Sequence, residues 1–256
     1  MPQHGTACGR AGRSPVTVHG MPTPLAGQRA RSRSAAGLPA VTAKKVVDAA
    51  VKLTVERGLE NWTLRQLAAA IGAYPAVVYH HVGDRDAVVC AVLDRVVGQL
   101  RLPDDKLEWQ EWFVELLTGL REVLRKHPGT ARRMASFGPS VAAATPTMER
   151  GVRILLDAGF GDESPLAYTV LTTTACQYVA LEDDRDCSLA LRLDNTEEYA
   201  SYRDREDLPG MAAHGRVMHE LLTDPEAAAG YHPRLFDFAI RSCLDGLTCR
   251  LARLRG

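Results

Sequence analysis

From Thr42 onward, apolar residues recur at the three- and four-residue spacing that gives a helix one apolar side. The first such stripe consists of Val46, Ala49, Ala50 and Leu53. The last consists of Phe236, Ile240, Cys243, Leu247, Leu251 and Leu254, close to the heptad spacing of paired helices. No segment alternates apolar and polar residues as a half-buried strand does. The sequence therefore predicts an all-α protein.

Two local signals mark the start of the second predicted helix. Thr63 and Gln66 have the spacing of a capping box, in which each side chain binds a backbone N–H at the helix start. Trp62 and Leu67 occupy the two positions of a hydrophobic staple across the same start. We therefore expect a helix to begin here.

A tight turn is expected to separate this helix from a third. Gly72 permits the turn, and Pro75 suits the first residue of a helix, where a missing N–H has no cost. The third helix is predicted to run to about Val82, and Asp84 is placed to cap a fourth. Two short helices joined by a Gly-containing turn are typical of a helix-turn-helix, although any three-helix bundle can show the pattern.

Positive charge is concentrated in the first third of a chain that is formally neutral as a whole. Residues 1–85 contain eleven Lys and Arg against four Asp and Glu, so they carry +7 and the remainder carries −7. Residues 1–38 contain five of these arginines, no acid and no helical period, which predicts a disordered arm. One interpretation is that the arm follows DNA phosphates or enters a minor groove. The alternative is a leader without function, or a start assigned too early. The charge distribution favours a polyanion as the partner of the first third.

The sequence Pro103-Asp104-Asp105 marks a predicted boundary between two domains. Residues 39–98 form the predicted helix-turn-helix domain, and residues 105–256 form a second helical domain. Within the latter, a helix is expected to end near Leu181. Residues 182–207 contain ten acids and are expected to form a mobile, solvated loop with a helical turn or two. The last helix is predicted to begin near Pro233.

Several classes of protein are excluded by what the sequence lacks. No run reaches the ~18 apolar residues of a membrane span and no secretory signal is present, so we expect a cytoplasmic protein that binds no membrane. No nucleophile with a base, carboxylate pair or phosphate loop has a diagnostic spacing, so neither an enzyme nor a cofactor is expected. His80 and His81 point in different directions on a helix and lack a third ligand, so no metal site is expected. The six cysteines have no CxxC spacing and are expected to be reduced and mostly buried.

The stretch from Thr63 to Val88 resembles the signature of the tetracycline-repressor family of transcriptional regulators. Leu67-Ala68-Ala69-Ala70-Ile71-Gly72 is similar to the family's Leu-Ala-x-x-(Leu/Ile)-Gly helix, and Val78-Tyr79-His80-His81-Val82 is similar to the end of its recognition helix. A weaker resemblance to the C-terminal domain of the tetracycline repressors continues through residues 155–160 and 179–183. The resemblance implies a homodimeric repressor that binds double-stranded operator DNA and is released by a small-molecule inducer.

The resemblance also implies which residues bind DNA. Arg65 would read a guanine edge, which a guanidinium matches with two parallel hydrogen bonds. Residues 75–77 would face the bases, with Val78 pointing inward, and the end of the helix would meet phosphates. The alternative role for Arg65 is a solvated surface charge, and the alternative role for Tyr79 is a core residue. The complete implied set is Thr63, Arg65, Tyr74, Pro75, Ala76, Val77, Tyr79, His80, His81 and Arg85.

Two positions depart from the family pattern. Tyr74 stands where the family usually has a Ser or Thr cap, so either the recognition helix is less firmly capped or the Tyr74 ring itself contacts DNA. Arg85 replaces the usual lysine as the phosphate clamp at the start of the fourth helix. Thr63 is implied to give its backbone N–H or its hydroxyl to a phosphate.

The second domain is implied to dimerise and to sense a ligand. The interface would lie on helices near residues 164–181 and 233–254, although the last helix could also be an ordinary core helix. The implied ligand contacts are Trp109, Trp112, Phe113, Met134, Phe137, Thr173, Gln177, Tyr178 and Glu182. Most of them are equally good core residues, so we expect about half to contact the ligand. Glu182 matches a glutamate that helps to hold drug-bound magnesium in tetracycline repressors. The metal-binding histidine has no counterpart in residues 129–134, so we expect another drug or a metabolite as the inducer.

Overall fold

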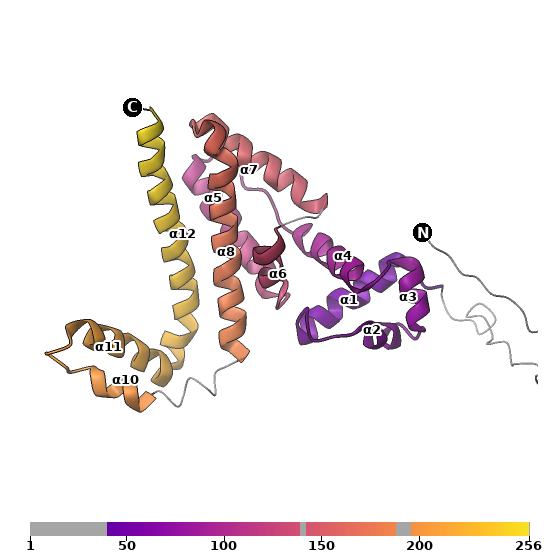
Figure 1. The fold of residues 1–256 in the computed structure, drawn as a ribbon, viewed down its shortest axis with the longest axis horizontal. Coiled ribbons are helices and arrows are strands. Elements are labelled where there is room, and N and C mark those ends of the chain that lie inside the picture. The colour runs from indigo at the N-terminus through magenta and orange to yellow at the C-terminus, as the bar shows by residue number, and fades with distance from the viewer. Residues whose placement is uncertain (1–39, 139–141, 188–195, 256) are drawn as a thin grey trace, which may run out of the picture. The chain divides into compact units, whose positions relative to one another are not determined.

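A computed structural model describes residues 40–138, 142–187 and 196–255, with the side chains of residues 185–187 left out. Every regular element in these ranges is a helix, which confirms the predicted all-α class (Figure 1). None of the helices in the described part of the chain is long and apolar enough to cross a membrane. The predictions for residues 1–38 lie outside the described residues.

Four helices form the N-terminal part of the described chain, and their starts follow local capping rules. Thr42 caps the first helix by accepting from the Lys45 backbone N–H, and Asp84 caps the fourth by accepting from that of Ala87. The predicted capping box of Thr63 and Gln66 is present in full. The four helices are α1 (Ala43–Arg57), α2 (Leu64–Ala70), α3 (Pro75–His81) and α4 (Arg85–Val97).

The core of this four-helix head is apolar, with one buried polar pair. Trp62 is buried, and its indole Nε1 donates to Thr54 Oγ1 at 3.1 Å. The Thr54 hydroxyl donates in turn to the Ala50 carbonyl at 2.9 Å, so both buried polar groups are satisfied. Leu67 and Val78 are fully buried, which fixes the side of α2 and α3 that faces inward. The inward direction predicted for Val78 is therefore confirmed.

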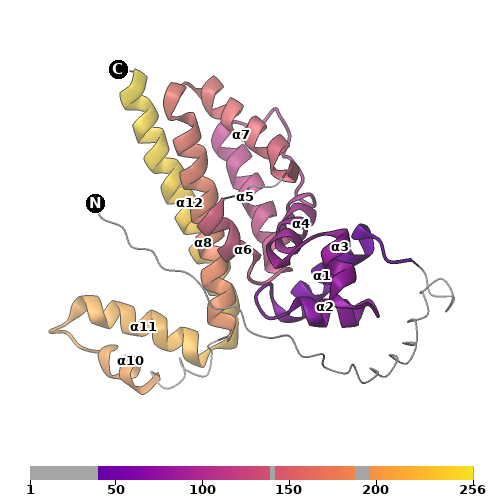
Figure 2. The ribbon, with the colours of Figure 1, turned by 45° about the vertical axis from the view of Figure 1, so that its right-hand side comes forward.

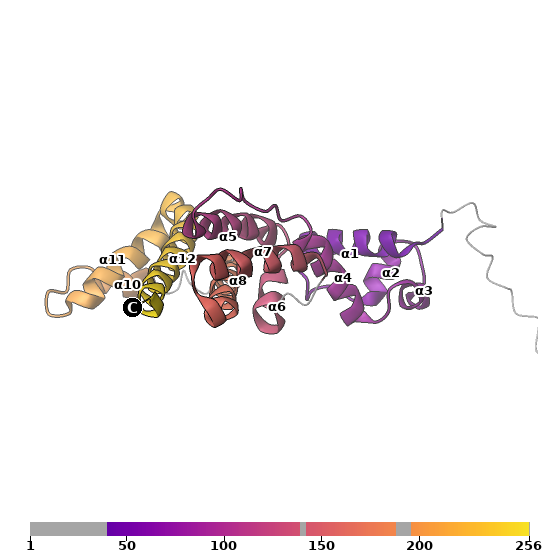
Figure 3. The same cartoon turned by 90° about the horizontal axis from the view of Figure 1, so that it is seen from above.

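The remaining helices form a body in which α8 and α12 lie side by side, with α5 and α7 against α8 (Figures 1 and 2). Seen from above, α5, α7 and α8 lie between α12 and the head (Figure 3). The hairpin of α10 and α11 packs against α12. The helices are α5 (Trp109–Arg125), α6 (Thr130–Phe137), α7 (Thr145–Ala158), α8 (Ser164–Cys187), α10 (Thr196–Tyr202), α11 (Pro209–Thr223) and α12 (Pro225–Arg255).

Two expectations for the C-terminal half and one for the cysteines are wrong. Helix α8 does not end near Leu181 but continues to Cys187, so the first part of the expected loop is helical. Helix α12 begins at Pro225, with Pro233 inside it, because Asp224 caps this earlier start by accepting from the Glu226 N–H at 2.8 Å. Of the four cysteines whose side chains are described, two are exposed and one is fully buried, so the expectation of mostly buried thiols is not met.

Candidate nucleic-acid interface and internal cavity

The turn between α2 and α3 presents the outer face of α3 to solvent. Gly72 takes a positive φ of 62°, which a side chain would disfavour, and Pro75 follows as the first residue of α3. Tyr74 occupies the cap position without a side-chain cap bond and is 75% exposed, so its ring is free to meet another molecule. Tyr79 is 54% exposed, which removes the alternative of a core role.

The other predicted contacts on α3 divide by exposure. Ala76 and His80 are exposed, four residues apart on the same side of the helix. Pro75, Val77 and His81 are half-buried. The structure therefore brings the predicted residues of α3 together on and around one exposed face.

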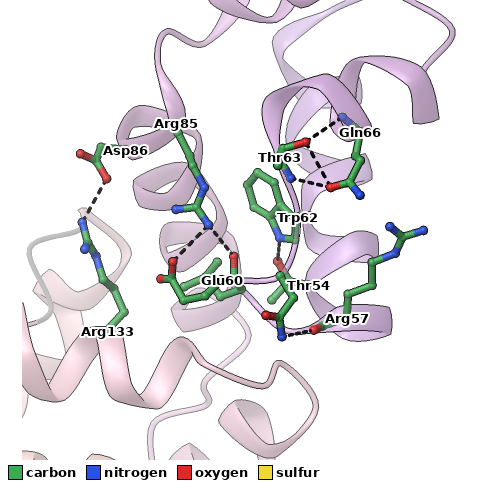
Figure 4. Close-up of polar contacts among 11 residues, drawn as sticks. Thr54, Arg57, Glu60, Trp62, Thr63, Gln66, Arg85, Asp86 and Arg133 are labelled. Carbon is green, nitrogen blue, oxygen red and sulfur yellow. Dashed lines mark hydrogen bonds and ion pairs between the residues drawn. The ribbon is translucent and has the colours of Figure 1, made fainter.

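Arg65 lies on the first turn of α2 and is exposed, and it makes no ion pair or hydrogen bond through its side chain within the described residues. Thr63 differs, because both of its donors are already used. Its backbone N–H donates to Gln66 Oε1 at 2.8 Å, and its hydroxyl donates to the same oxygen at 3.1 Å (Figure 4). In this structure Thr63 organises the start of α2, whereas Arg65 is available to a partner.

Arg85 is held inside the head. Its guanidinium Nη2 donates to the Leu59 carbonyl at 2.9 Å and to Glu60 Oε2 at 3.1 Å (Figure 4). The same group stacks over the Trp62 ring, 5.1 Å from its centroid. The predicted phosphate clamp is thus engaged in joining the start of α4 to the loop between α1 and α2. No local sequence pattern indicates this contact, because the partners lie 26 and 25 residues away.

We expect Arg85→Lys to lower the free energy of unfolding by about 1–2 kcal/mol, because an ammonium cannot keep both hydrogen bonds and the stacked contact together. Urea denaturation measures the change. Arg65→Lys is the matched control and should leave stability unchanged, since the Arg65 side chain is exposed and makes no hydrogen bond or ion pair within the described residues. If Arg85→Lys has the same free energy of unfolding as the wild type, the contacts of Arg85 do not stabilise the head.

Two hydrogen bonds and one ion pair join the body to the head within the described residues. The Leu59 N–H donates to the Pro128 carbonyl at 2.8 Å, in the turn between α5 and α6. Asp86, at the start of α4, pairs with Arg133 of α6 at 3.3 Å (Figure 4). Near the end of α4, Asp94 Oδ1 accepts from a backbone N–H at residue 143 at 2.8 Å. Helix α6 and the turn before it therefore hold both the α1–α2 loop and the start of α4.

Glu182 forms a buried salt bridge with α5. Both of its carboxylate oxygens accept from Arg121 at 2.9 Å, and Arg125 Nε lies 3.1 Å from one of them. The neighbouring Asp183 accepts from the Gly129 backbone N–H at 3.0 Å and pairs with Arg125 at 3.4 Å. Glu182 is thus neutralised by two arginines and is not placed to hold a ligand-bound metal. No cluster of three or more His, Cys, Asp or Glu suited to a metal occurs within the described ranges.

The pKa of Asp183 is raised, first because burial disfavours its charged form, and the Gly129 N–H and Arg125 only partly offset this. A carboxyl with a raised folded-state pKa stabilises the fold most below its unfolded pKa of about 4, and this contribution is lost as pH rises through the folded value. We therefore expect the stability of the wild type, relative to Asp183→Asn, to fall from pH 4 towards pH 7. Thermal unfolding of both proteins across this range measures it, and a relative stability that rises with pH would contradict the assignment.

A cavity of about 190 Å³ lies within the body, next to the end of α4. Val97 and Leu100 border it from the end of α4 and the segment that follows. Leu116 and Leu120 of α5 and Met134 of α6 supply most of the remaining apolar wall. The cavity therefore contacts α4 and α6, the two helices joined by the Asp86–Arg133 pair.

Polar groups reach the cavity mainly from α8, which contributes Tyr168, Thr169, Thr172, Thr173 and Cys176. These residues recur at helical spacing and so share one side of α8. The prediction from sequence included only Thr173 among them. The threonines at positions 169, 172 and 173 were a usable signal, because such polar residues are otherwise sparse in the apolar part of α8.

Two of the nine predicted ligand contacts, Met134 and Thr173, line this cavity. The predicted aromatic residues do not line this cavity, because bulk and helical spacing do not separate a core position from a cavity wall. Trp112 and Phe113 are fully buried against each other, and Trp109 packs on Phe160. The other predicted contacts away from the cavity are Phe137, which is 65% exposed beneath Arg133, and Gln177, Tyr178 and Glu182 of α8.

Comparison with known families gives two matches. Residues 46–92 match the family described as "Bacterial regulatory proteins, tetR family". Residues 102–250 match the family described as "Tetracyclin repressor-like, C-terminal domain", and this match alone spans more than half of the chain.

Two curated proteins are similar in sequence. An HTH-type transcriptional regulator of Saccharopolyspora erythraea is 33% identical over 133 residues, which are 50% of this chain and 55% of that protein. The HTH-type transcriptional repressor DrrR1 of Streptomyces coeruleorubidus is 27% identical over 226 residues, or 85% of this chain and 81% of the repressor. The match thus spans about half the length of the first relative and most of the second.

Two solved structures share the fold. ActR of Streptomyces coelicolor, a TetR family protein in complex with (S)-DNPA, has a TM-score of 0.67 at 20% identity over 83% of this chain and 100% of ActR. BioQ with its natural double-stranded DNA operator has a TM-score of 0.53 at 24% identity over 68% of this chain and 100% of BioQ. At these identities the likeness establishes the fold.

Proposed function

Because the chain belongs to the tetR family of bacterial regulatory proteins, we propose that it is a homodimeric repressor that leaves a palindromic operator when a small molecule enters its cavity. Membership makes it a DNA-binding transcriptional regulator and not an enzyme. The observation that carries the finer proposal is the position of the cavity, which borders both α4 and α6.

Operator binding is proposed to use α3 in the major groove, with Tyr74, Ala76, Tyr79 and His80 on its exposed face. Arg65 would add a base contact from the start of α2. The phosphate contacts are assigned to Tyr79 and the two histidines, whereas Arg85 positions the helices that carry them. The solved complex of the related BioQ with its operator supports DNA as the partner.

A second copy of the chain is proposed to pack against α8. Leu166, Val170, Gln177 and Leu181 fall on one side of this helix and are all exposed, although three of them are large and apolar. A recognition helix contacts one half-site only, so two copies about 34–36 Å apart are needed to read a palindrome. The α8 stripe gives the chain a surface for that pairing.

Release is proposed to follow from a population shift. A ligand in the cavity touches Val97 at the end of α4 and Met134 on α6. Helix α6 in turn holds the start of α4 through Arg133 and Asp86. A ligand that fits better when these two helices shift favours a head position that no longer matches successive major grooves. A differential affinity of ~100-fold, about 2.7 kcal/mol, is sufficient to vacate a marginally saturated operator.

The direct test is fluorescence anisotropy of the full chain on DNA from upstream of its own gene, with and without a panel of antibiotics and metabolites. We expect sequence-selective binding in the nanomolar range and release by at least one compound. A reporter gene behind the same DNA should be silenced by the chain. Equal affinity for the upstream DNA and for scrambled DNA of the same length would reject the proposal.

A further inference from the structure

We propose that the cavity selects an uncharged ring compound that is mostly apolar and carries a hydrogen-bonding oxygen or amide on the edge that faces α8. The inference rests on the proposed function only in assigning this cavity to the inducer. It concerns what the cavity binds, and this can be measured without DNA.

The exclusion of charged ligands follows from the lining. No Asp, Glu, Lys, Arg or His side chain lines the cavity in the described part of the chain. Burial raises the pKa of Tyr168 and of Cys176 to about 12 each, so both groups stay neutral near pH 7. The partly buried Arg121 is paired with Glu182 and does not line the cavity. An ion would lose its hydration there without gaining an opposite charge.

The preference for a polar edge follows from the hydroxyls of four threonines. Thr169 donates its hydroxyl hydrogen to the Pro165 carbonyl at 2.8 Å, and Thr172 donates to the Tyr168 carbonyl at 2.9 Å, so both offer lone pairs to a ligand donor. The hydroxyls of Thr147 and Thr173 have no hydrogen-bond partner within the described ranges, although both residues line the cavity. They can donate to a ligand oxygen.

The size and the apolar walls indicate a small ring system. An apolar cavity of ~150 Å³ in another protein holds benzene, so a volume of about 190 Å³ accommodates at least one ring and suits a flat bicyclic compound. The leucine side chains at positions 116 and 120 give it an apolar wall, and the flexible Met134 can adjust to its outline. 2-Naphthamide and 2-naphthoate form a matched pair of probes, because they have the same shape and differ in charge.

Equilibrium dialysis of the full chain at pH 7 measures both probes. We expect 2-naphthamide to bind at least about 100-fold more tightly than 2-naphthoate, since only the anion loses hydration without compensation. Thr173→Val removes one hydroxyl at constant shape and should weaken 2-naphthamide about five- to tenfold. Thr248→Val is the control, because that hydroxyl lies on α12 and donates to the Leu244 carbonyl.

Ala144→Leu places three more carbons at the cavity wall and should abolish probe binding, with helical content and operator binding checked on the same sample. Three outcomes would each overturn the inference. Naphthoate could bind as tightly as naphthamide, or neither probe could bind. In the third, Thr173→Val and Ala144→Leu would leave naphthamide binding unchanged. If operator binding persists in those cases, the proposed function as a DNA-binding regulator still stands and only the ligand class is rejected. Failure of operator binding with probe binding as expected would reject the repressor and leave the ligand class standing.

Discussion

Operator affinity is expected to fall at least about 30-fold when Arg65 is replaced by alanine. A guanidinium that makes two hydrogen bonds to one guanine contributes ~1–3 kcal/mol, and a dimer loses the contact in both half-sites. The side chain is exposed on the first turn of α2 and makes no hydrogen bond or ion pair within the described residues, so its removal should leave the head folded. The effect would then be one of recognition and not of stability.

The measurement is fluorescence anisotropy at one fixed salt concentration, because phosphate contacts make all such affinities depend on salt. Arg153→Ala is the matched control, since it removes the same charge from an exposed position on α7 that pairs with Glu149. Loss of Arg65 should also relax the preference for one base pair in each half-site. If Arg65→Ala and Arg153→Ala bind the operator with equal affinity, Arg65 is a solvated surface charge and not a base contact.

The second large effect is expected from Leu166→Asp combined with Val170→Asp. These side chains are 67% and 49% exposed on the same side of α8, so two carboxylates are tolerated in a single copy of the chain. In a dimer packed on this stripe they would be buried without partners, at a cost of several kcal/mol. We expect a monomer in size-exclusion chromatography with light scattering and at least about 100-fold weaker operator binding.

Leu156→Asp on α7 controls for this substitution, because Leu156 is also about half exposed and lies outside the stripe. It should leave both mass and affinity unchanged. If the double variant remains dimeric, the dimer interface does not lie on this side of α8. A monomer that keeps full operator affinity would contradict the need for two paired heads.

The accuracy of the predictions from sequence depends on how far apart the interacting residues lie. The capping box at Thr63, the proline that opens α3 and the cap at Asp84 each involve residues within three positions, and all three are present as expected. The same rules misplaced the start of α12, because Pro225 and Pro233 are both suitable first residues and only the first follows a capping aspartate.

Helical periodicity locates an outward-facing surface better than it locates a cavity wall. Side chains that face outward from α3 follow from helical periodicity once Val78 is placed inward. A cavity wall instead depends on which of several buried faces leaves space, and periodicity cannot separate the packed Trp112 from the cavity-lining Leu116. Of the predicted ligand contacts, only Met134 and Thr173 accordingly line the cavity.

Local sequence is sufficient for the helical class, the starts of α2, α3 and α4 and the exposed face of α3, because hydrogen bonds and periodicity within a few residues decide these features. Tertiary structure alone decided what the long charged side chains do. Arg85 reaches back 26 residues to the Leu59 carbonyl, and Arg121 reaches 61 residues ahead to Glu182. Several acceptors of equal chemistry compete for each guanidinium, and only the packing of the helices selects one.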